Sequence, residues 1–249
     1  MADKVTSATD FSASATDSAG SHTGTVLLAI SGLDGAGKST LVQTVVADLL
    51  AAGKSAAAIK VPDLSTWSLL EELGREDEPY APYAFDADRI SVALNLERFS
   101  CMRDLLGSHP AETEFLVIDR YLLDWAAVGR AFGSGDHELL LLEGIARRLK
   151  IPVLSFFIEV TPEMADRRIT DRGKTGDPRE GLHYLTRAYE CYWTMIQRPQ
   201  FDPHILDGAL PPKRLSASVL SRLSELGLLE PRAAAAIRPI RDVGVEVGG

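Results

Sequence analysis

The sequence predicts an α/β protein in which a parallel β-sheet is flanked by helices. Three observations lead to this prediction: short continuous apolar runs, their alternation with helical patterns, and a glycine-rich turn directly after the first run. Continuous apolar runs are typical of parallel strands that are buried on both faces. The expected strands cover residues 26–30, 56–60, 115–118 and 153–160, with a short fifth strand at 204–206.

Segments with helical periodicity separate these strands. In an open parallel sheet, ligands bind beyond the carboxyl ends of the strands, so the residues that directly follow each strand are the first candidates for a functional site. The expected helices cover residues 39–52, 66–73, 85–106, 136–149, 162–171, 180–197 and 216–226.

Composition limits the possible functions. The formal net charge of −9 argues against general nucleic-acid binding, which needs a basic face. No apolar run is long enough for a membrane span, so no membrane partner is expected. Cys101 and Cys191 lie far apart and form no metal-binding or redox motif. A reducing, cytoplasmic location is therefore the expectation.

The two ends of the chain differ in composition from its middle. Residues 1–24 are rich in Ser, Thr, Ala and Asp and lack the apolar segment of a signal peptide, so we expect a disordered extension. Residues 229–249 are rich in Ala, Pro and Gly, which favours a flexible tail. The remaining residues, 25–228, are expected to form one domain.

The glycine-rich turn at residues 32–40 fits the pattern G-x-x-x-x-G-K-[ST] of a P-loop. Glycine lets several backbone N–H groups converge on one anion, and the following helix adds its positive N-terminal end. Lys38 is expected to reach the outer phosphates of ATP, and Ser39 to bind Mg²⁺. The prediction is a P-loop NTPase fold whose nucleotide-binding residues are Gly32, Asp34, Gly35, Ala36, Gly37, Lys38, Ser39 and Thr40.

The tripeptide Asp119-Arg120-Tyr121 comes directly after the third expected strand. Arg120 is well placed there to bind an acceptor phosphate through two parallel hydrogen bonds. Asp119 is a candidate for orienting magnesium-bound water or Arg120 itself. The alternative is an ordinary ion pair at the end of a strand, without a role in binding.

A basic, glycine-containing segment follows the fourth expected strand. Its position and Gly173 favour a short lid that closes over a phosphate chain, with Arg168 and Arg172 in contact with ATP. The alternative is a solvated helix face. The basic residues are Arg167, Arg168, Arg172, Lys174 and Arg179.

Phe85 and Arg89 are four residues apart at the start of a long expected helix and therefore share a face. An aromatic ring and a guanidinium on one face can stack on a base and hydrogen-bond its edge. Taken alone, the pair is better explained as a core phenylalanine beside a surface arginine.

Together these motifs resemble the thymidylate kinase family of nucleoside monophosphate kinases. The likeness runs in order over residues 25–225. The carrying motifs are GLDGAGKST (32–40), VPDLST (61–66), FDADR (85–89), FLVIDRY (115–121), FFIEVTPEMADRRITDRGK (156–174) and ILD (205–207). The resemblance implies transfer of a phosphoryl group from ATP to dTMP, Mg²⁺ as the metal ion, and a homodimer.

Roles for single residues also follow from the resemblance. It implies that Phe85 stacks on the acceptor base, that Arg89 hydrogen-bonds this base and that Arg120 holds the acceptor phosphate. Asp34 would contact the acceptor sugar or its magnesium-bound water, and Pro62 belongs to a motif of the acceptor site. The basic lid resembles the bacterial type, in which lid arginines assist transfer.

The chain departs from the family pattern mainly on the acceptor side. Where the family commonly has an aromatic residue before Pro62 and an arginine shortly after it, this chain has Val61 and Asp63-Leu64. Asp124 and Trp125 stand where the family has a small hydroxyl residue and a polar residue that reads thymine. Val128 replaces a frequent tyrosine, and Thr170 the middle lid arginine.

Two alternatives to a dTMP kinase therefore stay open. The first keeps the phosphoryl transfer but uses another acceptor, such as a different nucleotide, a nucleoside or a specialised metabolite. Asp63, Asp124 and Trp125 motivate it. The second is a nucleotide-binding switch or scaffold without catalysis, against which the intact Lys38, Ser39 and Arg120 argue.

Overall fold

The structure is a computed structural model that describes residues 24–61, 64–66, 68–69, 72, 87–110, 112–149, 153–173 and 181–229. Apart from Gly24 and Leu229, the expected N-terminal extension and C-terminal tail lie outside these ranges. The same holds for several residues singled out above, namely Pro62, Asp63, Phe85, Lys174 and Arg179.

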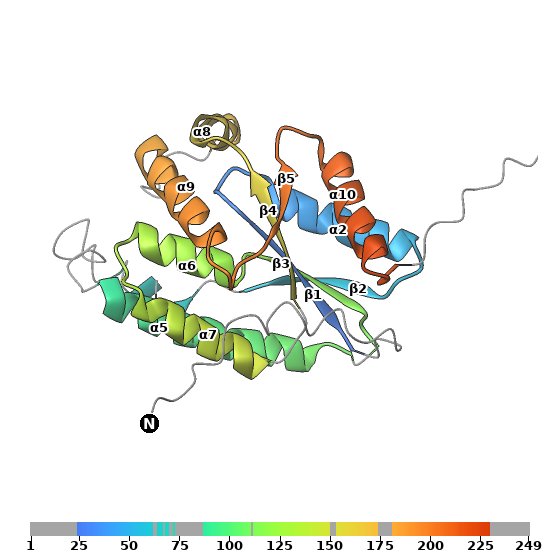
Figure 1. Ribbon diagram of the computed structural model, residues 1–249, viewed down its shortest axis with the longest axis horizontal. Helices are drawn as coiled ribbons and strands as arrows, with labels where there is room; N and C mark the ends of the chain where they lie inside the picture. Colours follow the sequence, from blue (N-terminus) through green and yellow to red (C-terminus); the bar gives the residue numbers. More distant parts are fainter. Residues whose placement is uncertain are drawn as a thin grey trace, which may run out of the picture.

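A five-stranded parallel sheet with the order β2-β3-β1-β4-β5 forms the centre of the described fold (Figure 1). Every residue of β1 is buried, as expected for a central strand covered on both faces. In the register, Ile30 of β1 lies opposite Asp119 of β3, so the P-loop and Asp119-Arg120 leave the sheet at one edge. The strands are β1 (Val26–Gly32), β2 (Ala56–Lys60), β3 (Phe115–Asp119), β4 (Val153–Glu159) and β5 (His204–Asp207).

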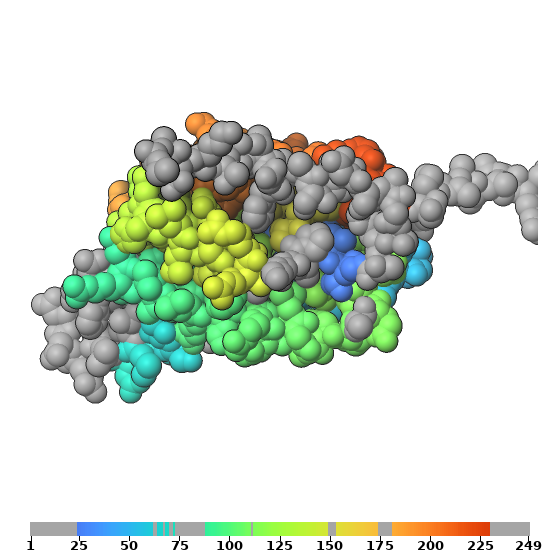
Figure 2. All heavy atoms as spheres, turned by 60° about the horizontal axis from the view of Figure 1, so that its bottom comes forward, coloured from blue at the N-terminus to red at the C-terminus, as the bar shows by residue number. Residues whose placement is uncertain are grey.

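Helices cover both faces of the sheet. Helices α2 and α10 pack together on one face, and α5, α6, α7 and α9 cover the other (Figure 1). Figure 2 shows α7 lying against α5 on the outside of the second layer. The helices are α2 (Lys38–Ala51), α5 (Ala87–Ser108), α6 (Leu122–Ala131), α7 (His137–Leu149), α8 (Pro162–Asp171), α9 (Leu182–Ile196) and α10 (Pro212–Glu225).

The structure confirms the α/β class and the five expected strands, with end positions that differ by at most two residues. Helix α6 was not expected. Its residues are buried on nearly all sides, so the sequence lacks the one-sided apolar pattern that reveals a surface helix. Helix α10 begins at Pro212 rather than 216, because proline suits the first turn of a helix. Half of the expected helix 66–73 lies outside the described residues, and its described residues, 66, 68, 69 and 72, are helical.

Within the described ranges, no helix is both long and apolar enough to cross a membrane. The hydrophobic core lies along both faces of the sheet. Leu27, Leu28 and Ile30 of β1, together with Phe156 and Phe157 of β4, are among its fully buried side chains. This packing fixes the carboxyl ends of β1, β3 and β4, where the candidate site lies.

Candidate active site

The P-loop backbone requires glycine at two positions between β1 and α2. Gly35 has φ 84°, and a Cβ at this position would collide with the carbonyl oxygen of Ala165 on α8. Gly37 has φ 96° and forms the N-cap of α2. Both conformations are left-handed and favour glycine. The loop is therefore pressed against α8, and the N-terminal N–H groups of α2 stay available for an anion.

Lys38 lies under the loop, and its side chain is only 6% exposed. Its Nζ donates to the carbonyl oxygens of Gly32 at 3.0 Å and Leu33 at 2.8 Å, and it lies 3.7 Å from a carboxylate oxygen of Asp34. Burial lowers the pKa of Lys38, and the nearby charge of Arg120 lowers it further. The lysine is thus held at the loop by neutral carbonyl groups that a phosphate oxygen can replace.

Ser39 and Asp119 form a polar pair where β3 meets the start of α2. The Ser39 hydroxyl donates to Oδ2 of Asp119 at 2.5 Å. The other carboxylate oxygen, Oδ1, is buried and has no hydrogen-bond partner in the described part of the protein. Mg²⁺ prefers such oxygen ligands and commonly takes only one or two carboxylates besides phosphate and water. The donor set of Ser39 and Asp119 therefore fits Mg²⁺.

Arg120 adopts an unusual backbone conformation at the end of β3. Its φ of 73° is the left-handed region that residues other than glycine rarely occupy, and its N–H donates to the carbonyl of Ile30. Its guanidinium forms an ion pair with Asp34 of the P-loop. Burial lowers the pKa of Arg120, but the surrounding negative charges, of which Asp34 contributes most, together outweigh this effect and raise the pKa overall. The arginine therefore stays charged beside the P-loop.

Asp124, on α6, lies in different surroundings from those that its sequence position suggested. It is 1% exposed, and four donors surround its carboxylate. One oxygen accepts from the Ser31 hydroxyl at 2.6 Å and the Tyr121 N–H at 3.1 Å. The other accepts from the Tyr192 hydroxyl at 2.6 Å and the Gly32 N–H at 3.3 Å. Its geometry therefore favours support of the P-loop over contact with an acceptor.

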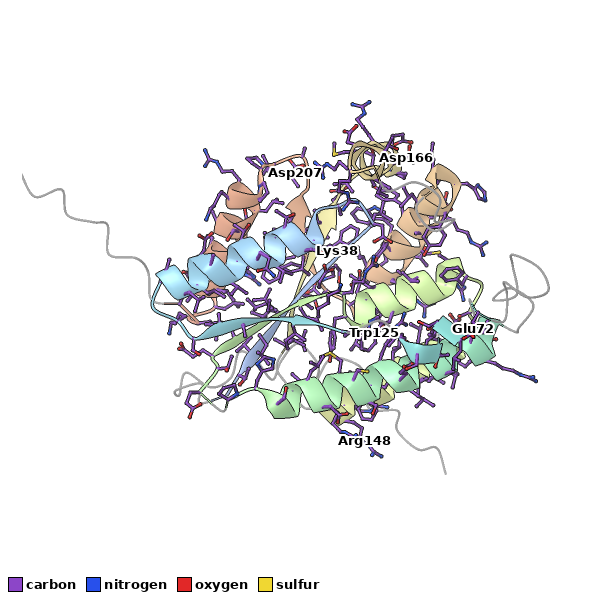
Figure 3. All side chains as sticks on the ribbon, turned by 180° about the vertical axis from the view of Figure 1, so that it is seen from behind. Lys38, Glu72, Trp125, Arg148, Asp166 and Asp207 are labelled. Atoms are coloured by element: carbon purple, nitrogen blue, oxygen red, sulfur yellow. The ribbon has the colours of Figure 1, made fainter. Side chains whose placement is uncertain are left out.

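Trp125 is likewise covered by protein, and its side chain is 3% exposed. It lies between the end of the sheet and α5 (Figure 3), with its ring 5.4 Å from that of Tyr121. The guanidinium of Arg98 lies over its ring at 5.5 Å from the centroid. By its position in the sequence, Trp125 was a candidate for contact with the acceptor. In the structure its ring packs between Tyr121 and the guanidinium of Arg98.

The lid arginines lie in two different surroundings. Arg168 on α8 donates to the carbonyl oxygens of Gly208 at 2.8 Å and Ala36 at 3.4 Å, so it joins the P-loop to the turn after β5. Arg172 is exposed at the end of α8, and its Nε donates to the carbonyl of Arg168 at 3.1 Å. Arg168 is thus fixed at the loop, whereas Arg172 remains open to solvent.

The remaining predicted site residues lie in the P-loop, in α2 and in α5, or outside the described residues. Ala36 is buried in the P-loop, and Thr40 is exposed in the first turn of α2. Arg89 is exposed on α5, and the structure does not describe Phe85 or Pro62. The sequence analysis gave no role to Ser31, Arg98 or Tyr192. For Tyr192 a weak signal existed, since it follows the lid on a helix, but nothing in the local pattern distinguished it from a core tyrosine.

The comparisons with known proteins agree with this geometry. A family model described as Thymidylate kinase matches residues 30–219, which is well over half of the chain. The chain belongs to the thymidylate kinase family. The matched region contains the P-loop, the Asp119-Arg120 pair and the lid arginines of this family member.

Curated relatives carry the same family name. A thymidylate kinase from Leptospira interrogans (strain Fiocruz L1-130) is 28% identical over 184 residues, which cover 70% of this chain and 82% of the relative. One from Xylella fastidiosa (strain 9a5c) is 26% identical, with coverages of 67% and 76%. One from Xanthomonas oryzae pv. oryzae (strain PXO99A) is 29% identical, with coverages of 66% and 69%.

Proposed function

We propose that this chain is an ATP-dependent kinase that converts dTMP to dTDP. The observation that carries the proposal is the meeting of three groups at one edge of the sheet: Lys38 in the P-loop, the Ser39–Asp119 pair, and Arg120 against Asp34. Phosphoryl transfer needs mainly positioning and charge neutralisation, and these groups supply both. Family membership and the names of the relatives support dTMP as the acceptor.

On the donor side, we assign the phosphates of ATP to the backbone N–H groups of residues 32–40. Lys38 would exchange its bonds to the carbonyls of Gly32 and Leu33 for phosphate oxygens. Ser39 and Asp119 would hold Mg²⁺, which neutralises phosphate charge when bound. Arg168 would keep the P-loop fixed against the turn after β5, and Arg172 would approach the transferred group from the lid.

On the acceptor side, a phosphate oxygen of dTMP attacks the γ-phosphorus, and the bond to the bridging oxygen of ADP breaks. This oxygen is already anionic at neutral pH, so no strong general base is required. Arg120 would hold the acceptor phosphate after exchanging its ion pair with Asp34, whose carboxylate would then contact the sugar or bound water. Phe85, Arg89 and Pro62 remain assigned to the acceptor nucleotide by family likeness.

A second candidate keeps this chemistry and changes the acceptor. The observation in its favour is the burial of Asp124 and Trp125, which leaves neither side chain free to read thymine in the family manner. A site built to hydrogen-bond one base discriminates strongly against others, so the change of these residues bears directly on specificity.

Assembly and compartment belong to the same proposal. We propose a homodimer, supported by Leu96 and Leu140, whose side chains are 51% and 68% exposed on the adjoining helices α5 and α7. Cys101 and Cys191 are both free, which supports a reducing, cytoplasmic environment. Sedimentation velocity of the purified chain would test the dimer, and a monomer at micromolar concentration would contradict it.

The function is tested by incubating the purified chain with ATP, Mg²⁺ and dTMP and separating the products by ion-exchange chromatography. We expect equal amounts of ADP and dTDP, and product formation that is at least about 100-fold slower with the Lys38→Met variant. Formation of ADP without dTDP would contradict the proposal. The Lys54→Met variant is the matched control, since Lys54 lies outside the site in an ion pair with Glu114.

A further inference from the structure

Arg98 on α5 is a partly buried cation to which the proposed function gives no role. Its guanidinium lies over the ring of Trp125, and its Nη1 donates to Oδ1 of Asn95 at 2.8 Å. A guanidinium has five N–H donors. Within the part of the chain that the structure describes, this bond and the stacking contact account for its close polar and aromatic contacts.

The surroundings of Arg98 fix the direction in which it points. Asn95 is fully buried, and its amide donates to Oε1 of Glu138 at 2.7 Å. The same oxygen accepts from the Ser91 hydroxyl, and Glu138 is 3% exposed. Gly129 on α6 leaves room for this carboxylate, because a Cβ there would collide with it. Three helices thus hold Asn95, which in turn orients Arg98.

Arg98 lies on the acceptor side, because it stacks on Trp125, whose ring packs on Tyr121 directly after Arg120. Burial lowers its pKa to about 10; Glu138 opposes this shift, whereas the like charge of Arg120 adds to it. Asp124 also acts on the pKa of both arginines. Arg98 is still charged at neutral pH, so two guanidinium groups repel each other near the end of β3. Oxygen atoms of a ligand beside them would relieve this repulsion.

Partial burial of a cation costs free energy, and one hydrogen bond to a neutral amide offsets only part of this cost. We propose that Arg98 is an acceptor-binding residue whose remaining N–H groups donate to oxygen atoms of the acceptor nucleotide. The inference rests on the proposed function. The competing role is purely structural, with Arg98 serving as a counter-ion for Glu138 where α5 packs on α7.

The test compares the steady-state kinetics of Arg98→Met with those of the wild type. We expect the KM for dTMP to rise roughly 10- to 100-fold, as for the loss of a charged hydrogen bond, while the KM for ATP stays within about twofold. Arg98→Lys should recover part of the loss. Arg103→Met is the control, because Arg103 is 65% exposed on the same helix and pairs with its neighbour Asp104. An unchanged KM for dTMP would overturn the proposal.

A second variant separates binding from folding. Removing Arg98 alone leaves the buried Glu138 without the cation whose charge favours its ionised form, so Arg98→Met will lower the melting temperature. The double variant Arg98→Met/Glu138→Gln removes both charges and is expected to recover most of the melting temperature but none of the affinity for dTMP. If the KM for dTMP recovers together with the melting temperature, the role of Arg98 is structural and the proposal fails.

Binding of thymidine and dTMP, measured by calorimetry, identifies which oxygens Arg98 contacts. A loss of affinity in Arg98→Met for dTMP alone assigns it to the phosphate, and an equal loss for both assigns it to the base carbonyls. No loss for either ligand would overturn the proposal. The same titration remains decisive if the wild type shows no dTMP turnover, a result that would count against the proposed function and leave the assignment of Arg98 to binding alone.

Discussion

The donor side and the acceptor side of this site are built in different ways. On the donor side, the backbone of residues 32–40 determines the geometry, and Gly35 and Gly37 adopt conformations that few other residues tolerate. On the acceptor side, side chains from α5, α6, α7 and α9 determine it, through networks around Asp124 and Glu138. A backbone-built site resists sequence change, whereas a side-chain-built site can be rearranged by a few substitutions.

The two sides are joined at Asp124. Its carboxylate accepts from Ser31 and Gly32 of the donor side, and from Tyr192 on α9. It therefore holds the end of β1 against the helix that follows Arg120. By sequence, Asp124 stands in the part of the family pattern that contacts thymine. In the structure its carboxylate instead connects α6 to the start of the P-loop. The comparison can be tested by damaging each side separately.

The largest effect is expected on the donor side, from Lys38→Met. The variant removes a cation from the phosphate chain, and we expect kcat to fall by about 10²- to 10³-fold or more, with little change in stability. Steady-state kinetics with dTMP and thermal unfolding measure the two quantities. A variant that retains more than about a tenth of wild-type kcat would show that the loop does not bind the transferred phosphate.

Gly35→Ala tests whether backbone geometry governs the donor side. Gly53, with φ 79° and open space around it, is the matched control. Both substitutions carry the cost of a left-handed alanine, about 1–2 kcal/mol. Gly35→Ala must in addition move the loop away from Ala165, so it should lose more stability and bind ATP more weakly. Denaturant unfolding and ATP titration would contradict this view if the two variants behaved alike.

Asp124→Asn tests the connection between the two sides. The amide keeps the size of the side chain but presents N–H groups to a donor such as Tyr192 or Gly32. Each unsatisfied buried donor costs about 1–3 kcal/mol, so the free energy of unfolding should drop by that order. Because the end of β1 is no longer held, kcat/KM for ATP should decrease as well. Tyr192→Phe removes one of the four donors and should have a smaller effect in both assays.

The smallest effect concerns the loop after β2, which Glu97 of α5 holds by accepting from the N–H groups of Ser65 and Thr66. Burial raises the pKa of Glu97, but the hydrogen bonds from Thr66 and Ser65 outweigh it and bring the pKa to about 2, below its usual 4.5. A lowered carboxyl pKa stabilises the fold above pH 4.5, and this contribution is lost as the pH falls toward 2.

Glu97→Gln should therefore reduce stability at neutral pH by about 0.5–1 kcal/mol and flatten the pH dependence of unfolding between about pH 4.5 and 2. Urea unfolding at a series of pH values measures this change. Glu225→Gln, in an exposed ion pair with Arg222, is the control. If the free energy of unfolding depends on pH equally in the wild type and in Glu97→Gln between about pH 4.5 and 2, the bonds from Ser65 and Thr66 to Glu97 do not stabilise the fold.

The sequence predicted the donor side well because its requirements are local. The glycine spacing, Lys38 and Ser39 lie in one short segment, and the continuous apolar runs identified the strands that bring Asp119 and Arg120 to it. The sequence did not predict helix α6, because burial on most of its sides removes the amphipathic pattern. Asp124 was assigned to the acceptor because its partners Ser31 and Tyr192 are distant in sequence.

The sequence analysis gave no role to Arg98 for a related reason. On α5 it reads as one of several charged residues, and only the packing of α5 against α6 and α7 reveals Trp125 and Asn95 around it. No periodic pattern carries such information, because it depends on which side chain of one helix meets which side chain of another. In our proposal, contacts of this kind select the acceptor, which makes substrate specificity harder to predict from sequence than phosphate binding.

The central claim is that an intact donor side serves a rearranged acceptor side that still takes dTMP. The most direct test is to measure kcat/KM of the wild type for dTMP, dUMP, dCMP, dAMP and dGMP under the same ATP and Mg²⁺ concentrations. We predict that dTMP is preferred by at least about tenfold over each of the others. Lys38-dependent turnover that favours a different acceptor, with dTMP among the poor substrates, would contradict the claim.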